Sequence, residues 1–266
     1  MPFTGEDGRR LDRVHLVQRA PGTFQLTRSF SYLEPGRQES ERITVRAHDE
    51  SKPAKGSNAT DLASVPPFLW GLIASHGRHT SAALLHDQLW WECLNPDPRV
   101  WIEQRREADR LFRVALREIG TTPLRTALLW SAVSLEKYVG PRPWQALLMG
   151  GHVIAGTAVL WLALSGTLGW AGLALLPVPV LTALLWRRDA APVAILIHLG
   201  VLFLPVAVMA LVGQYLLIAL DLVGWYLGDR SGAMPKSGPL GRTRRSKQRA
   251  RERVRRSGEE RRSRRT

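Results

Sequence analysis

Acidic, imidazole and hydroxyl side chains occur in the polar first half of the sequence at positions that suit catalysis. His86 and Asp87 are adjacent, Asp109 lies in the next helical stretch, and Asp61 and Ser64 precede them all. An imidazole beside carboxylates is suited to general base catalysis, and paired carboxylates are suited to binding a divalent cation. The candidate catalytic residues are His86, Asp109 and Ser64, and the candidate metal ligands are Asp61 and Asp87. If these residues are catalytic, the reaction expected is hydrolysis, and the candidate cofactor is a divalent metal ion.

The spacing of His86 and Asp109 predicts that the two side chains lie close together. The helix-breaking residues 95–98 have their midpoint at position 97.5, and each residue is 11.5 positions from it (97.5 − 86 and 109 − 97.5). Two antiparallel helices joined by this short turn place both side chains at the same height. A buried carboxylate without a partner costs several kcal/mol, and the candidate partners of Asp109 are His86, Arg105 and Ser64. Two interpretations remain open, a structural hydrogen-bonded network and a catalytic or metal site.

Short strands are predicted before these helices. Residues 24–34 alternate apolar and polar side chains, and residues 42–47 are rich in β-branched side chains. Both patterns are typical of strands, and Pro35-Gly36 between them is typical of a turn. Residues 1–22 are polar, rich in glycine and without a period, so they predict a flexible arm.

Four helices are predicted around the candidate residues. Apolar side chains recur at three- and four-residue spacing near His86 and near Asp109, so both residues are expected to face the core. The predicted helices span residues 66–74, 80–93, 100–119 and 122–138. Together with the strands they define an α+β domain of residues 23–142, which is long enough to bury its own core.

An apolar region follows the α+β domain. Residues 143–186 are a run of 44 residues without Asp, Glu, Lys or Arg. One membrane-spanning helix needs only about 20 apolar residues, so the run predicts a hairpin of two spanning helices, 146–164 and 168–186. Ordinary soluble enzymes are excluded by this segment.

A second apolar block covers residues 190–228. One helix of this length would be nearly 60 Å long, about twice the hydrocarbon thickness of a bilayer. Two crossings are therefore predicted, with a kink at Pro205 and a turn near Gly213. The region 143–228 as a whole predicts an all-α transmembrane bundle of two helical hairpins with four spans.

The tail, residues 229–266, carries most of the positive charge. Its 15 Lys and Arg residues against 4 Asp and Glu give +11, leaving only +3 of the chain's +14 for the rest. A segment with so few apolar residues is predicted to be disordered. Because basic segments stay in the cytoplasm, the sequence predicts an integral, multi-pass membrane protein with both termini cytoplasmic. The predicted partners are the lipid bilayer and, through this basic tail, anionic lipid headgroups or nucleic acid.

Several established templates are absent from the sequence. Cys93 is the only cysteine, which excludes an intrachain disulfide and a zinc cluster built on cysteines. The glycine-rich phosphate loops, the Gly-x-Ser-x-Gly elbow and the His-Glu-x-x-His helix do not occur either. The remaining candidates for chemistry are the His and Asp residues named above.

Three blocks of the sequence resemble a known family. They are Thr60-Asp61-Leu62-Ala63-Ser64-Val65-Pro66, Ala82-Ala83-Leu84-Leu85-His86-Asp87-Gln88-Leu89-Trp90 and Ala108-Asp109-Arg110-Leu111-Phe112. In this order they are similar to the phage-associated domain-of-unknown-function family numbered 1353, over about residues 22–140. That family has no established activity, so the resemblance implies a fold and candidate positions but no reaction.

Two hypotheses follow from the sequence. In the first, the chain is a membrane-anchored, phage-type module without catalytic activity, and its Asp and His residues form a buried polar network. In the alternative, it is a membrane-tethered, metal-dependent hydrolase that uses a His-Asp/Asp site. A bound divalent metal ion would distinguish the two.

Overall fold

The structure is a computed structural model that describes residues 3–62, 77–93, 97–139, 143–175 and 177–227. By its internal contacts the chain divides into two compact units. One unit is Trp101–Val208, and the remainder of the chain forms the other. The predicted domain boundary near residue 142 stays a prediction.

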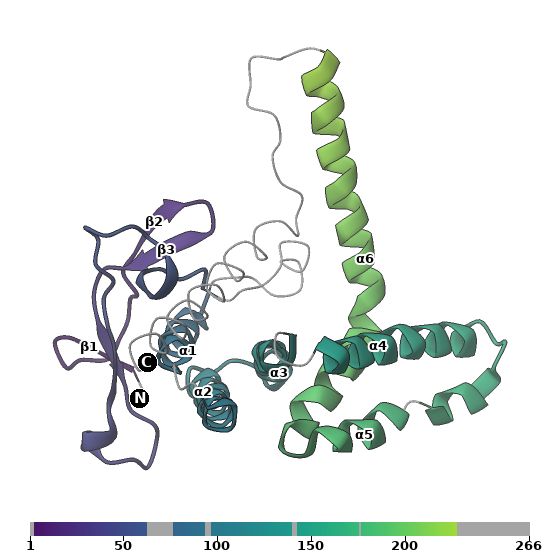
Figure 1. Cartoon of the computed structure of the whole chain (residues 1–266), viewed down its shortest axis with the longest axis horizontal. Coiled ribbons are helices and arrows are strands. Elements are labelled where there is room, and N and C mark those ends of the chain that lie inside the picture. The colour runs from purple at the N-terminus through teal and green to yellow at the C-terminus, as the bar shows by residue number, and fades with distance from the viewer. Residues whose placement is uncertain (1–2, 63–76, 94–96, 140–142, 176, 228–266) are drawn as a thin grey trace, which may run out of the picture. The chain divides into compact units, whose positions relative to one another are not determined.

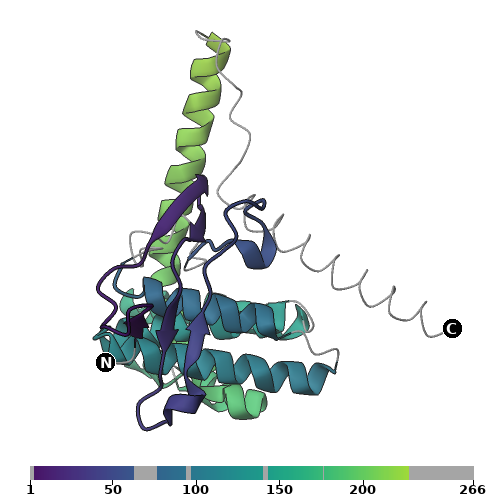
Figure 2. The ribbon, with the colours of Figure 1, turned by 90° about the vertical axis from the view of Figure 1, so that its left-hand side faces the viewer.

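Five short strands precede the helices (Figure 1). They are β1 (Phe3–Gly5), β2 (Leu16–Ala20), β3 (Thr23–Leu26), β4 (Phe30–Tyr32) and β5 (Ile43–Val45), with 3₁₀-helices η1 (Glu39–Glu41) and η2 (Gly56–Asn58) in the loops. An antiparallel sheet has the order β1-β4-β5, and β2 and β3 form a separate hairpin (Figure 2).

Aromatic side chains form the core of the three-stranded sheet. The ring of Phe3 lies 5.8 Å from the ring of Phe30 and 4.9 Å from that of Tyr32, measured between centroids, and all three residues are buried. The predicted strand pair joined through Pro35-Gly36 is confirmed as β4 and β5. The alternating run 24–34, however, is divided between β3 and β4.

Residues 1–22 differ from the expected flexible arm. The structure places β1 and β2 there, and β1 pairs with β4 through the register Phe3 to Tyr32. Burial of the Phe3 ring holds β1 on the sheet, and β2 is held by its pairing with β3. Strands of three to five residues are too short to show a period, which is why the sequence did not indicate them.

Three helices agree closely with their predicted ranges. They are α1 (Thr80–Glu92), α2 (Pro98–Glu118) and α3 (Pro123–Val139). Proline as the first residue of α2 and of α3 suits a helix start, where its missing N–H group has no partner to lose. The predicted helix 66–74 lies outside the described residues.

The first apolar block forms only one continuous long helix. Helix α4 (Pro143–Leu164) confirms the first predicted helix of this block. The predicted helix 168–186 is wrong, because η4 (Gly169–Leu175), α5 (Val178–Ala183) and η5 (Leu184–Asp189) occupy this stretch as separate short helices. Glycine and proline are frequent there, and proline removes a backbone donor and clashes with the preceding turn.

The second apolar block is a single helix, α6 (Ala190–Leu227), of 38 residues (Figure 1). The predicted turn near Gly213 is therefore wrong. No polar turn residue accompanies Gly213, and a single glycine costs a helix only about 1 kcal/mol. Pro205 lies inside α6 without dividing it. Within the described residues two helices are long and apolar enough to cross a membrane, so the predicted four spans are not supported.

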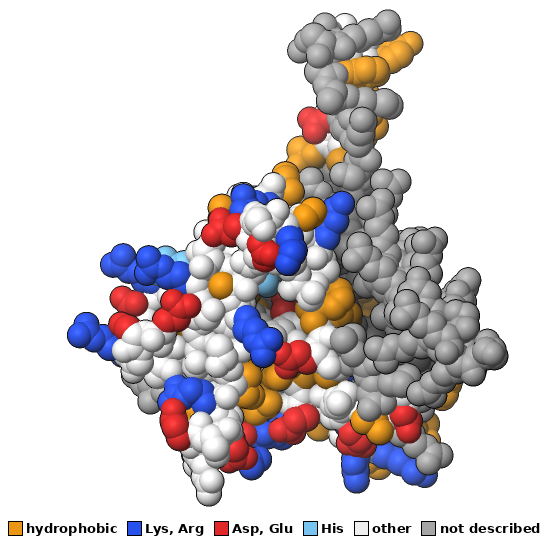
Figure 3. Space-filling view, turned by 60° about the vertical axis from the view of Figure 1, so that its left-hand side comes forward, with side chains coloured by type: hydrophobic (Ala, Val, Ile, Leu, Met, Phe, Trp, Pro, Cys, Tyr) orange, Lys and Arg blue, Asp and Glu red, His pale blue; other side chains and the backbone are white. Residues whose placement is uncertain are grey.

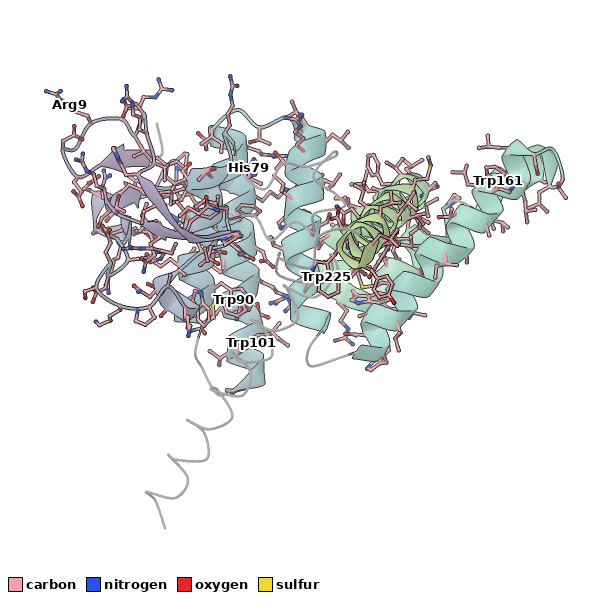
Figure 4. All side chains as sticks on the ribbon, turned by 90° about the horizontal axis from the view of Figure 1, so that it is seen from above. Arg9, His79, Trp90, Trp101, Trp161 and Trp225 are labelled. Atoms are coloured by element: carbon pink, nitrogen blue, oxygen red, sulfur yellow. The ribbon has the colours of Figure 1, made fainter. Side chains whose placement is uncertain are left out.

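Large apolar side chains project outward from α4 and α6. Among those more than half exposed are Leu147, Trp161, Leu202, Met209, Leu217 and Leu227. Trp161 lies near the end of α4 and Trp225 near the end of α6 (Figure 4). Much of the apolar surface of these two helices is therefore not buried against the described residues.

Helices α4 and α6 pack closely where each has a glycine. A Cβ atom on Gly156 would lie 2.6 Å from Val201, and one on Gly200 would lie 2.8 Å from Val153. The hydroxyl of Thr157, next to this contact, donates a hydrogen bond to the Val153 carbonyl at 2.8 Å. Small residues at such contacts are typical of helices that pack in membranes.

Candidate functional site

Thr60 fastens the loop that carries the first predicted motif. Its backbone N–H and C=O groups both pair with Phe24 at 2.9 Å, which ties the loop to β3. Its hydroxyl donates a hydrogen bond to the Asp87 carboxylate at 2.5 Å and accepts one from the Leu62 N–H at 2.8 Å. One buried threonine therefore connects the loop, the β3 strand and helix α1. The sequence contained Thr60 in the quoted motif, but its role was not predicted.

Leu62 adopts a backbone conformation that is unusual for its residue type. Its φ angle is +62°, in the left-handed region, and its side chain is buried. A residue other than glycine pays roughly 1–2 kcal/mol for this conformation. The strain is held in place by the hydrogen bond between Leu62 and Thr60.

The predicted metal ligands Asp61 and Asp87 differ in their surroundings. Asp61 is exposed, whereas Asp87 is half-buried and accepts the hydrogen bond from Thr60. Among the residues that the structure describes, no group of three or more His, Cys, Asp or Glu side chains is placed to hold a metal ion. Ser64 lies outside the described residues. The metal site therefore stays a prediction.

His86 is buried in α1, as its apolar neighbours predicted, with 5% of its surface exposed.

Gln88, two residues further along α1, holds this helix against the sheet. The Gln88 carboxamide donates to the Thr44 carbonyl and accepts from the Arg46 N–H, both at 2.7 Å. Gln88 thus continues the hydrogen bonding of β5, and no local pattern in the sequence indicates this contact.

Asp109 is buried in α2 with 4% of its surface exposed, as predicted. The hydroxyl of Ser134 on α3 donates a hydrogen bond to its carboxylate at 3.2 Å. Ser134 was not among the predicted partners, and no local pattern identifies a partner 25 residues away. His86 and Asp109 belong to different compact units, and their pairing stays a prediction.

Arg105, the other predicted partner, is also buried in α2. Its guanidinium carbon lies 4.9 Å from the centre of the Trp101 ring. This distance is within the range of a cation–π interaction. Helix α2 therefore buries an arginine and an aspartate one turn apart, a costly arrangement that requires the surrounding polar contacts.

The loop 49–58 is closed by the carboxamide of Gln25. The buried Gln25 donates to the carbonyls of Asp49 and Asn58, at 3.2 and 3.0 Å, and accepts from Arg19 Nε at 2.7 Å. The Asp49 carboxylate accepts hydrogen bonds from Lys52 and Ser51, which lower its pKa to about 2. The Asp49 carboxylate therefore stays ionised throughout the neutral and mildly acidic range.

His48 adjoins this loop and pairs with β3 through its ring. Its Nδ1 accepts a hydrogen bond from the Leu26 N–H at 3.0 Å, which requires that nitrogen to be unprotonated. Burial lowers the pKa of His48 below its ordinary value of 6.5. The imidazole is therefore held in its neutral form as a structural acceptor.

An ion pair joins α2 to the residue that precedes α6. Arg106 Nε and Nη2 donate to Asp189 Oδ2 at 3.0 and 2.6 Å, and the Asp189 side chain is only 4% exposed. Glu103 lies between Arg106 and Arg188, at 2.7 and 3.1 Å from them. The hydrogen bond to Asp189 is the main reason that the pKa of Arg106 lies above its ordinary value. The sequence did not indicate this network, because the residues of α2 and those before α6 are more than 80 positions apart.

The described residues define an α+β assembly of short strands and helices joined to two long apolar helices. Residues 40–133, which are 94 of the 266 residues, match the model of a family described as "Protein of unknown function (DUF1353)". The matched segment contains Thr60, His86, Asp87 and Asp109. The resemblance to this family is thereby confirmed for residues 40–133. A phage association and the fusion to an apolar region are not part of this match, and the chain has no significant match to a curated protein or a solved structure.

Proposed function

We propose that the chain is a membrane-anchored module that holds its family domain at a bilayer through α4 and α6. The observation that carries the proposal is the outward exposure of the large apolar side chains along these two helices. Soluble monomers rarely expose contiguous apolar patches larger than a few hundred Å². A bilayer supplies the apolar surroundings that the chain itself does not.

The length of the apolar part of α6 supports the same conclusion. Residues 190–220 are 31 consecutive residues without Asp, Glu, Lys or Arg. In a helix they extend about 46 Å, more than the roughly 30 Å of a hydrocarbon core. A helix keeps all of its backbone hydrogen bonds within itself, which is what a lipid environment demands.

Membrane association is tested by alkaline carbonate extraction of the full-length chain from membranes. We expect the chain to stay in the membrane pellet. The double variant Leu202→Arg, Met209→Arg, at exposed positions on either side of the centre of the apolar run, should be extracted more readily, because each arginine costs about 2.5–3.5 kcal/mol at the centre of a spanning helix. The matched control is Leu124→Arg on α3, which is exposed outside the apolar helices and should behave as wild type. Release of the wild-type chain into the supernatant would refute the proposal.

In this proposal the Asp and His residues of the family motifs have a structural role. Asp87 accepts from Thr60 and Asp109 accepts from Ser134, so each carboxylate joins its helix to another element. Buried carboxylates are normally retained only with such partners, and these contacts hold the loop and α3 in place. The network is thus the internal scaffold of the anchored domain.

The basic tail is proposed to bind anionic lipid headgroups at the membrane surface. Each Lys or Arg near an anionic surface contributes about 1 kcal/mol, and the tail has a net charge of +11 (15 − 4). Charged side chains of both signs are interspersed on the face of the protein in Figure 3, so that face offers no comparable basic patch. A peptide of residues 229–266 should bind acidic vesicles and be released by salt. Equal binding to neutral vesicles, or a preference for nucleic acid, would contradict this part of the proposal.

A second candidate function is a membrane-tethered hydrolase that uses His86, Asp109 and Ser64, with Asp61 and Asp87 as ligands of a divalent metal ion. The observation that favours it is the strained φ angle of Leu62, next to Asp61, because such strain is concentrated at active sites and ligand clamps.

The hydrolase hypothesis is tested by thermal unfolding of the full chain with calcium, magnesium, manganese or zinc. A metal at a hundred times its dissociation constant should stabilise the protein by about 2.7 kcal/mol, and Asp87→Asn should abolish this gain. The control Asp49→Asn changes an exposed carboxylate outside the motifs and should leave the gain intact. Unchanged melting with all four metals would eliminate the metal-dependent hydrolase.

A further inference from the structure

The ion pair between Arg106 and Asp189 fixes where α6 begins. Asp189 is the last residue of η5, and α6 starts at Ala190. Its carboxylate is almost fully buried against the Arg106 guanidinium of α2, with two nitrogen–oxygen distances of 3.0 Å or less. A buried charge that loses its partner is strongly destabilising, so Asp189 cannot leave Arg106 at low cost.

Two neighbouring contacts support this attachment. Glu103, three residues before Arg106 on α2, also bonds Arg188, so α2 contacts two successive residues of the segment. Trp186 is buried in an apolar cluster with Met149 and Ile197. Residues 186–189 form the corner before α6. Ion pairs of Arg188 and Asp189 and the apolar contacts of Trp186 together hold this corner in place.

The other end of α6 is far from this corner. A continuous helix of 38 residues extends about 57 Å, and its longest run without a charged residue covers residues 190–220. Two crossings would need about 40 apolar residues and a turn, whereas the uncharged run before Asp221 has 31 residues and α6 has no turn. One crossing is the arrangement that fits both its length and its continuity.

We propose that Asp189 is held on the same face of the membrane as α2, and that α6 crosses the membrane once, so that Leu227 lies on the opposite face. This inference rests on the membrane anchoring proposed above. In this arrangement α4 leads away from that face of the membrane. The short helices η4, α5 and η5 then lead back to it, and residue 189 lies on the same face as residue 143. The arrangement replaces the even number of crossings, with both termini in the cytoplasm, that the sequence predicted.

The proposal is tested by the accessibility of single cysteines in the full chain. In a Cys93→Ser background, Glu107→Cys on α2, Arg188→Cys at the corner and Leu227→Cys at the end of α6 are labelled with a membrane-impermeant maleimide. All three positions are largely exposed. Labelling is compared between intact cells and inverted membrane vesicles.

We expect the cysteines at 107 and 188 to be labelled in one preparation and the cysteine at 227 in the other. Labelling of all three from the same side would overturn the single crossing while leaving the membrane anchor intact. Labelling of 107 and 188 from opposite sides would overturn the attachment of the corner to α2. Recovery of the chain in the soluble fraction would instead refute the anchor itself, so the two proposals fail in different ways.

A cross-linking experiment tests the attachment without disturbing the buried ion pair. Glu103→Cys and Arg188→Cys remove the contacts of Glu103 with Arg106 and Arg188 but keep both residues of the Arg106–Asp189 pair, and a short bis-maleimide should join the two cysteines in membranes. Glu118→Cys with Arg188→Cys is the control, because Glu118 lies about 22 Å along α2 from Glu103 and is out of reach. Equal yields from the two pairs would refute the attachment. Adding Asp189→Asn to the first pair should lower its yield severalfold.

Discussion

Replacement of Thr60 by valine tests whether the first family motif acts as a fastening between loop, strand and helix. Valine keeps the shape of threonine and removes its hydroxyl, which donates to Asp87 at 2.5 Å and accepts from the Leu62 N–H at 2.8 Å. A hydrogen bond to a charged group contributes about 1.5–3 kcal/mol and a neutral one about 0.5–1.5 kcal/mol. Thr60→Val should therefore cost about 2–4 kcal/mol of local stability.

The assay is native-state hydrogen exchange of the full chain in detergent. The protection of the Leu62 and Thr60 amides reports the opening of the loop, because the first donates to the lost hydroxyl and the second to Phe24. Asp87→Asn is a second variant that keeps an acceptor oxygen and removes only its charge, so its effect should be smaller.

The matched control is Thr27→Val, which removes the same hydroxyl at a less buried position. The Thr27 hydroxyl makes one hydrogen bond, of 3.2 Å, to the His15 carbonyl, so its loss should cost under about 1 kcal/mol. Equal, small changes in the hydrogen-exchange rates of Thr60→Val and Thr27→Val would show that the Thr60 hydroxyl does not hold the loop on α1.

Two further predictions concern the pH response and the helix contact. The pKa of His48 in the folded protein is below its ordinary value of 6.5, so the neutral ring stabilises the fold at pH above 6.5. This contribution should be lost as the pH falls through the folded pKa. The unfolding free energies of wild type and His48→Gln should therefore converge in acid. Gly156→Ala places a Cβ 2.6 Å from Val201 and should destabilise the protein by about 1–3 kcal/mol, whereas Gly150→Ala, in open space, should stabilise it by about 0.5–1 kcal/mol. Thermal unfolding in detergent measures both, and equal shifts for the two alanines would contradict the close contact.

The helices of the first half were predictable because their signals are local. The period of apolar residues placed α1 and α2 within a few residues of their observed ends, and it predicted that His86 and Asp109 are buried. Proline and glycine near the helix ends supplied the boundaries. The same signals confirmed the turn between β4 and β5.

The apolar region shows where composition is an insufficient guide. The runs 168–186 and 190–228 have similar hydrophobicity, yet the first is broken and the second is one helix. The first contains two prolines in three positions, Pro177 and Pro179. Helix α6 has Pro192 in its first turn, where proline is tolerated, and Pro205 alone in its interior. The length of residues 190–228, compared with the thickness of a bilayer, predicted two crossings. The prediction of a turn was wrong, because a helix longer than the hydrocarbon core need not turn within it.

The partners of the candidate residues were not predictable for another reason. Thr60 with Asp87, Ser134 with Asp109 and Arg106 with Asp189 are 27, 25 and 83 residues apart. A period or a motif indicates that a residue is buried, but only the packing of distant elements decides which partner it meets. The sequence therefore predicted that Asp109 is buried and needs a partner, and the structure identifies Ser134 as one.

The depth of α6 in the bilayer tests the membrane anchor most directly. The midpoint of α6 lies beside Met209, whose side chain is 75% exposed. In a Cys93→Ser background, an environment-sensitive fluorophore is attached to Met209→Cys or, as the control, to Arg188→Cys, and the chain is reconstituted into vesicles. We expect lipids brominated in their acyl chains to quench the label at 209 while aqueous iodide does not, and we expect the reverse for the label at 188. Quenching of the label at 209 by iodide as strongly as the label at 188 would contradict a membrane-spanning α6.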